Sequence, residues 1–82
     1  MKLLEFQLLS QDEQIIILYQ QGVYIGKKRQ GDRTRLLFQL DSFYVEVIYT
    51  SYRRSIHRIH ISDSTAILEP YLEQIKIEYF VV

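Results

Sequence analysis

Two histidines, His57 and His60, are the residues best suited to metal chemistry in this chain. A zinc site needs three or four converging ligands, usually histidine, cysteine or carboxylate. The sequence has no cysteine, and Asp63 is the only carboxylate close to the pair in sequence. In a strand, two residues three positions apart point to opposite faces of the sheet, which makes chelation by both imidazoles difficult. We therefore expect no metal site, and no other cofactor.

Nucleophilic and phosphate-binding motifs are missing as well. None of the serines lies in a glycine-flanked elbow, and helix capping or turn formation already accounts for them. The three glycines are too widely spaced for a phosphate-binding loop, and no Gly-Lys-Ser/Thr follows them. A single domain of 82 residues also has little volume for a catalytic cavity, although a dimer interface could create one. We predict that the protein is not an enzyme.

Basic residues are concentrated in the middle of the chain, although the formal net charge is zero. Eight of the ten lysines and arginines lie between residues 22 and 60, where only three carboxylates accompany them, giving +5. Residues 1–21 carry −2 and residues 62–82 carry −3. A neutral chain with a basic centre suggests contact with a macromolecule through that centre. The basic residues are Lys27, Lys28, Arg29, Arg33, Arg35, Arg53, Arg54 and Arg58.

The elements that position these residues follow from local patterns. Ser10 and Glu13 form a capping box, which predicts a helix from about Gln11 that ends at Gly22 in a left-handed conformation. Alternating apolar residues then predict strands at 23–30, 34–40, 43–50 and 56–61, joined by short turns. Capping residues at 62–65 predict a second helix, which Pro70 either bends or delays to about Glu69. We expect this helix to direct its apolar side chains inward, namely Ile67, Leu68, Tyr71, Leu72 and Ile75.

Together these elements predict one domain, residues 1–82, of the α+β class. We expect a four-stranded antiparallel meander with an N-terminal and a C-terminal helix packed on one face. Residues 1–9 could form a helical turn or an apolar arm. Residues 76–82 could add an edge strand or remain an arm.

The sheet face away from the helices is the predicted interaction surface. The alternation places on it apolar and aromatic residues with arginines at their rim, a composition that protein interfaces favour. We expect a small protein-interaction module that binds itself as a homo-oligomer or binds another protein, with no small-molecule substrate. The alternative is binding of single-stranded RNA or DNA by the same face and the basic hairpins. The residues of the predicted face are Tyr24, Arg35, Leu37, Tyr44, Ile48 and Arg58.

Three stretches resemble a group of short bacterial proteins from the Bacteroidetes, for which no activity is known. They are LYQQGVYIGK (18–27), LDSFYVEV (40–47) and ILEPYL (67–72), and the resemblance covers most of the chain. It implies a stand-alone bacterial protein and assigns no site residue. The acidic residue at position 5 and the lack of a long apolar run argue against a signal peptide and a membrane span. We expect a cytoplasmic protein.

Overall fold

The computed structural model describes residues 1–50 and 55–72. The chain starts with two short helices, α1 (Leu3–Gln7) and α2 (Gln11–Gln21). The predicted capping box is confirmed at α2, because the Ser10 hydroxyl accepts from the Glu13 amide and the Glu13 carboxylate accepts from the Ser10 amide, both at 3.2 Å. The helical turn expected as one option for residues 1–9 is α1.

Helix α2 ends at Gly22 as predicted, but for a different reason. Gly22 has extended backbone angles, φ −72° and ψ 146°, so the left-handed cap expected there is wrong. A Cβ atom at this position would lie 2.6 Å from the Leu18 carbonyl oxygen, well inside van der Waals contact. Glycine is needed here because the chain passes so close to the last turn of the helix.

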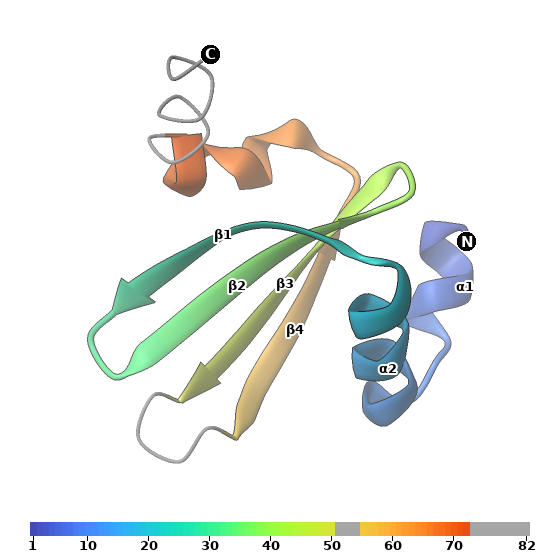
Figure 1. Ribbon diagram of the computed structural model, residues 1–82, viewed down its shortest axis with the longest axis horizontal. Helices are drawn as coiled ribbons and strands as arrows, with labels where there is room; N and C mark the ends of the chain where they lie inside the picture. The colour runs from blue at the N-terminus through green and yellow to red at the C-terminus, as the bar shows by residue number, and fades with distance from the viewer. Residues whose placement is uncertain (51–54, 73–82) are drawn as a thin grey trace.

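Four strands form one antiparallel sheet in the order β1-β2-β3-β4, which confirms the predicted meander (Figure 1). The strands are β1 (Val23–Gln30), β2 (Arg33–Leu40), β3 (Phe43–Thr50) and β4 (Ile56–Ser62). Each bound lies within one residue of the prediction. The β1–β2 turn contains Gly31 with φ +58°, a conformation that glycine adopts without steric cost. The β2–β3 turn places Asp41 at φ +53°, and aspartate is one of the residues that tolerate this region.

The main core lies between the two N-terminal helices and one face of the sheet, which we call the α2 face. Phe6 from α1 and Leu18 from α2 are buried there against strand residues whose side chains alternate toward them. The phenyl rings of Phe6 and Phe43 are 5.7 Å apart between centroids. Burial of these side chains removes large apolar areas from water and is the main stabilising contribution of the fold. The buried strand residues of this cluster are Leu40, Phe43, Val45 and Val47.

A 3₁₀ helix, η1 (Thr65–Tyr71), follows the sheet and meets its other face, which we call the η1 face. The Tyr71 hydroxyl donates to Glu46, and Glu46 lies between Val45 and Val47 in β3, so it points away from α2. Figure 1 shows η1 well apart from α1 and α2. The α+β class is confirmed, but the structure does not show both helical segments on one face.

The C-terminal segment also differs from the predicted α-helix. Ser64 caps it by accepting from the Ala66 amide at 3.2 Å, close to the expected start. The segment is a 3₁₀ helix, and Pro70 lies within it. Of the residues predicted to point inward, Tyr71 is fully buried and Ile67 and Leu68 are half-buried, whereas Leu72 is exposed, so the prediction for Leu72 is wrong. The predictions for Ile75 and for residues 76–82 lie outside the described residues.

Candidate binding surfaces

Five of the six residues predicted for the interaction face do share one face of the sheet. Strand pairing places Arg35 opposite Ile48 and Ile48 opposite Arg58, while Leu37 and Tyr44 lie in the next rows of the same face. This is the η1 face. However, Leu37 is 0% exposed and Ile48 is 3% exposed, so the exposure expected for both is wrong. Tyr44 is half-buried, and Arg58 is exposed.

Tyr24, the sixth residue, lies on the α2 face. It pairs with Phe38, and the two rings are 5.8 Å apart in an edge-to-face arrangement. The register of β1 shifts between Tyr24 and Gly26. Such a bulge inserts one extra residue, here Ile25, and reverses the alternation for the remainder of the strand. Simple alternation along β1 therefore assigned Tyr24 to the wrong face.

A buried carboxylate joins η1 to the sheet. Glu46 is 3% exposed, and its Oε2 atom accepts from the Tyr71 hydroxyl at 2.7 Å. Its Oε1 atom lies 3.6 Å from Arg35 Nη1 and 3.8 Å from His60 Nδ1. Burial of the phenol, and next its hydrogen bond to Glu46, raise the pKa of Tyr71 well above its ordinary value. A buried charge is tolerated only when such partners replace its hydration, so this cluster holds the C-terminal segment on the sheet.

Sequence reasoning did not detect this cluster. The cluster joins Glu46 of β3 to Tyr71 of η1, which was expected only to point inward. The two residues are 25 positions apart, and no local pattern connects them. The sole available signal was a carboxylate in the middle of the most regular strand of the chain.

Basic side chains form a row across the η1 face, which we call the basic row: Lys28, Arg35 and Arg58. Lys28 of β1 is directly opposite Arg35 of β2, and Arg35 and Arg58 flank Ile48 of β3. Two like charges at directly opposed positions repel each other and destabilise the pairing. Within residues 1–50 and 55–72, Arg35 has an ion pair, with Glu46, and neither Lys28 nor Arg58 has one.

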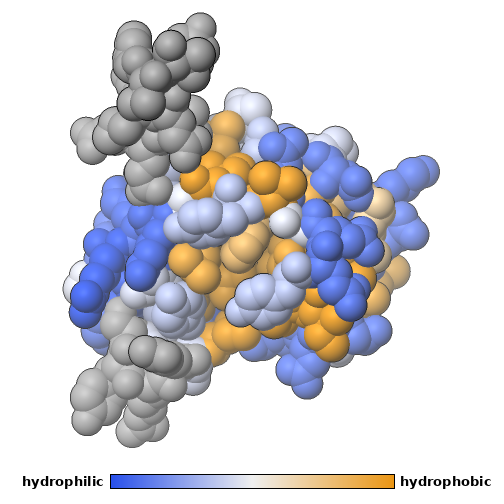
Figure 2. All heavy atoms as spheres, viewed as in Figure 1, coloured by the Kyte–Doolittle hydropathy of each residue, from blue (hydrophilic) through white to orange (hydrophobic). Residues whose placement is uncertain are grey.

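The α2 face carries a cleft of about 490 Å³, which lies between α2 and the part of the sheet that this helix does not cover. Its floor contains Leu36, Phe38 and Val47 from the two central strands. Lys27 and Arg29 of β1, which the bulge directs to this face, form one rim. Figure 2 shows hydrophobic surface between the hydrophilic hairpin end of the sheet and the hydrophilic side of α2.

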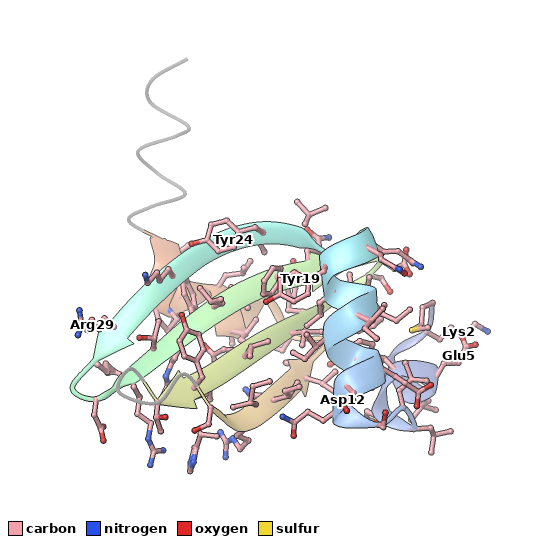
Figure 3. The ribbon with its side chains drawn as sticks, turned by 60° about the horizontal axis from the view of Figure 1, so that its bottom comes forward. Lys2, Glu5, Asp12, Tyr19, Tyr24 and Arg29 are labelled. Atoms are coloured by element: carbon pink, nitrogen blue, oxygen red, sulfur yellow. The ribbon has the colours of Figure 1, made fainter. Side chains whose placement is uncertain are left out.

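Tyr19 forms the opposite wall of the cleft. Its side chain is 77% exposed and extends from α2 over the strands, while Arg29 marks the far end of β1 (Figure 3). The cleft volume falls within the range of about 300–1,000 Å³ that is common for binding sites. An apolar floor between a basic rim and a tyrosine can hold a molecule that has both apolar groups and negative charges.

Within residues 1–50 and 55–72, no group of three or more histidine, cysteine or carboxylate side chains converges to hold a metal ion. Over the same residues, no helix has the length and apolar character needed to cross a bilayer.

Comparison with known proteins gives no family for this chain: no family model, curated protein or solved structure matches it. The resemblance to short Bacteroidetes proteins stays a prediction. A function must therefore be inferred from the cleft on the α2 face and the basic row on the η1 face.

Proposed function

We propose that this protein is a bacterial, cytoplasmic protein-interaction module that binds a segment of a partner protein in the cleft between α2 and the sheet and performs no catalysis. The observation that carries the proposal is the apolar floor of the cleft, left open between Tyr19 and the cations of β1. An open apolar site of this kind on a small domain gains free energy when a partner covers it.

The exposed residues around the cleft have the composition of an interface. Ile16 and Tyr19 of α2 and Val23 and Tyr24 of β1 are all more than half exposed, although they are large apolar or aromatic residues. Tyrosine is enriched in interface centres because it contributes a large apolar area together with a polar hydroxyl. Of these residues, Tyr19 lines the cleft and Tyr24 packs on the floor residue Phe38, while Ile16 and Val23 lie outside the lining.

The charges of the cleft indicate the chemistry of the partner. Among residues 1–50 and 55–72, Lys27 and Arg29 are the charged residues that line it. A matching segment would place two or three apolar side chains on the floor and one or two carboxylates beside β1. A terminal segment of a second copy satisfies the same description, since residues 62–82 carry −3. Charge complementarity of this kind favours the encounter and fixes orientation, while apolar contact supplies most of the affinity.

Selection from a library of random 12-residue peptides displayed on phage tests this proposal. We expect the selected peptides to combine apolar residues with aspartate or glutamate. A synthetic selected peptide should shift the amide resonances of Leu36, Phe38 and Val47 in a nitrogen-15 spectrum. Tyr19→Ala should weaken binding by about tenfold or more, because truncating an interface aromatic commonly costs more than about 1.4 kcal/mol.

Leu8→Ala is the matched control, since Leu8 is 88% exposed and lies outside the cleft lining. This variant should bind the peptide like the wild type. Arg29→Glu should weaken the binding of acidic peptides and leave the binding of uncharged peptides nearly unchanged. Selected peptides that bind Tyr19→Ala and Arg29→Glu as tightly as the wild type would show that the cleft is not the site.

Homo-oligomer formation is the second part of the proposal. Light scattering across a range of protein concentrations measures it directly. If a second copy occupies the cleft, the wild-type mass should rise with concentration, and the mass of Tyr19→Ala should stay at 9.9 kDa. A mass that rises equally in both proteins would exclude the cleft as the contact between copies.

A further inference from the structure

We infer that the basic row on the η1 face binds the phosphate backbone of a nucleic acid. This inference is independent of the proposed function, because the row and the cleft lie on opposite faces of the sheet. It starts from the alignment of Lys28, Arg35 and Arg58 across β1, β2 and β4.

Repulsion between the cations of the row destabilises the fold, and the described residues offset this repulsion only in part. Lys28 and Arg35 are direct cross-strand partners of the same sign. Glu46, a carboxylate in the next row, already accepts from Tyr71 and faces His60 as well as Arg35. In addition, Arg35 Nε is buried and has no hydrogen-bond partner among the described residues. A bound polyanion would remove the repulsion between the cations and offset the cost of keeping them together.

The spacing of the row suits a repeating anion better than a single small one. Neighbouring strands are about 4.8 Å apart, so the row from β1 to β4 spans roughly 14 Å. The cations therefore follow one another across the sheet, as the phosphates of a nucleic-acid strand do along its backbone. Arg33, exposed one row nearer the hairpin turn on the same face, extends the positive surface along β2.

Two aromatic rings lie on the same face beside the row. His60 pairs with Glu46 in the neighbouring row, and its side chain is 47% exposed. Tyr44 is half-buried one row further. Bases stack on aromatic side chains of sheet surfaces, with cations following the backbone, which favours a nucleic acid over an acidic protein as the partner.

Fluorescence anisotropy of the full chain with labelled oligo-dT and with a labelled duplex tests the inference. If Lys28, Arg35 and Arg58 each neutralise one phosphate of a single strand, log K should fall with log salt with a slope of about −2, taking −0.7 for each contact. Affinity should then drop by roughly 20-fold between 50 and 200 mM salt. Preferential binding of oligo-dT would show that the rings take part, whereas equal binding of the duplex would indicate backbone contacts alone.

The double variant Lys28→Ala/Arg58→Ala leaves the Arg35–Glu46 pair in place and should reduce the salt slope to about −0.7. Lys2→Ala removes a charge beside α1, outside the row and outside the cleft lining, and is the control, with an expected slope near that of the wild type. Equal loss of binding in both variants, no binding at 50 mM salt, or equally tight binding of a labelled oligo-glutamate peptide would each overturn the inference.

Discussion

Tyr71→Phe tests whether the hydrogen bond to Glu46 holds η1 on the sheet. The substitution keeps the ring, which is 0% exposed, and removes only the hydroxyl that donates to Glu46 Oε2 at 2.7 Å. A hydrogen bond to a charged group contributes about 1.5–3 kcal/mol, and its loss leaves an acceptor of the buried carboxylate unsatisfied. We expect the free energy of unfolding to fall by about 2 kcal/mol. For a domain of this size, that corresponds to a lowering of Tm by roughly 8–16 °C.

Urea and thermal unfolding followed by circular dichroism measure this change. Tyr19→Phe is the control, because the same hydroxyl is removed from a ring that is 77% exposed, and its effect should stay within about 0.5 kcal/mol. Combining Tyr71→Phe with Glu46→Gln completes a double-mutant cycle, which should give a coupling energy of about 1 kcal/mol or more. Equal effects of Tyr71→Phe and Tyr19→Phe, with no coupling to Glu46, would refute the anchoring role of the bond.

Three further predictions concern the same fold. The raised pKa of Tyr71 means that the neutral phenol stabilises the folded state. This contribution is complete below the unfolded pKa of about 10 and is lost as pH rises beyond it. In urea titrations between pH 9 and 11, the stability of the wild type should therefore fall more steeply than that of Tyr71→Phe. Ser10→Ala should lower the free energy of unfolding by about 1 kcal/mol, measured in the same way, since the hydroxyl caps α2 through the Glu13 amide; no change would mean that the cap does not contribute. Leu37→Glu should abolish the folded circular dichroism spectrum, because a second carboxylate directly opposite Glu46 would replace a side chain that is 0% exposed; a folded variant would contradict the burial.

The strands and α2 could be predicted because their signals are local. The β3 segment has the clearest period-two pattern in the chain, and the Ser10–Glu13 capping box is contained within four residues. Turn residues at the ends of the strands fixed the hairpins, and hairpins with short connections leave the meander as the simplest sheet order. Each of these inferences needed only neighbouring residues.

The assignment of faces could not be predicted to the same extent, because it depends on single-residue shifts and on long-range contacts. One extra residue at the β1 bulge transfers Tyr24 to the α2 face. The burial of Leu37 and Ile48 depends on what packs over the η1 face, and the described contact there, Tyr71 with Glu46, joins positions 25 residues apart. Alternation shows which residues share a face, but not which face a later segment covers.

The same alternation explains how a run of basic residues supplies two different surfaces. Lys27, Lys28 and Arg29 are consecutive in β1, so the pleat sends Lys27 and Arg29 to the cleft and Lys28 to the basic row. Both faces become positive although the chain as a whole is neutral. A segment this basic would be unfavourable on a sheet whose faces were both fully covered by helices. Here α2 covers only part of one face, so the cations stay accessible beside an apolar floor. Because the two surfaces use alternate residues of one strand, Arg29→Glu and Lys28→Ala act on opposite faces, and a partner of either face can be distinguished by which of the two variants it ceases to bind.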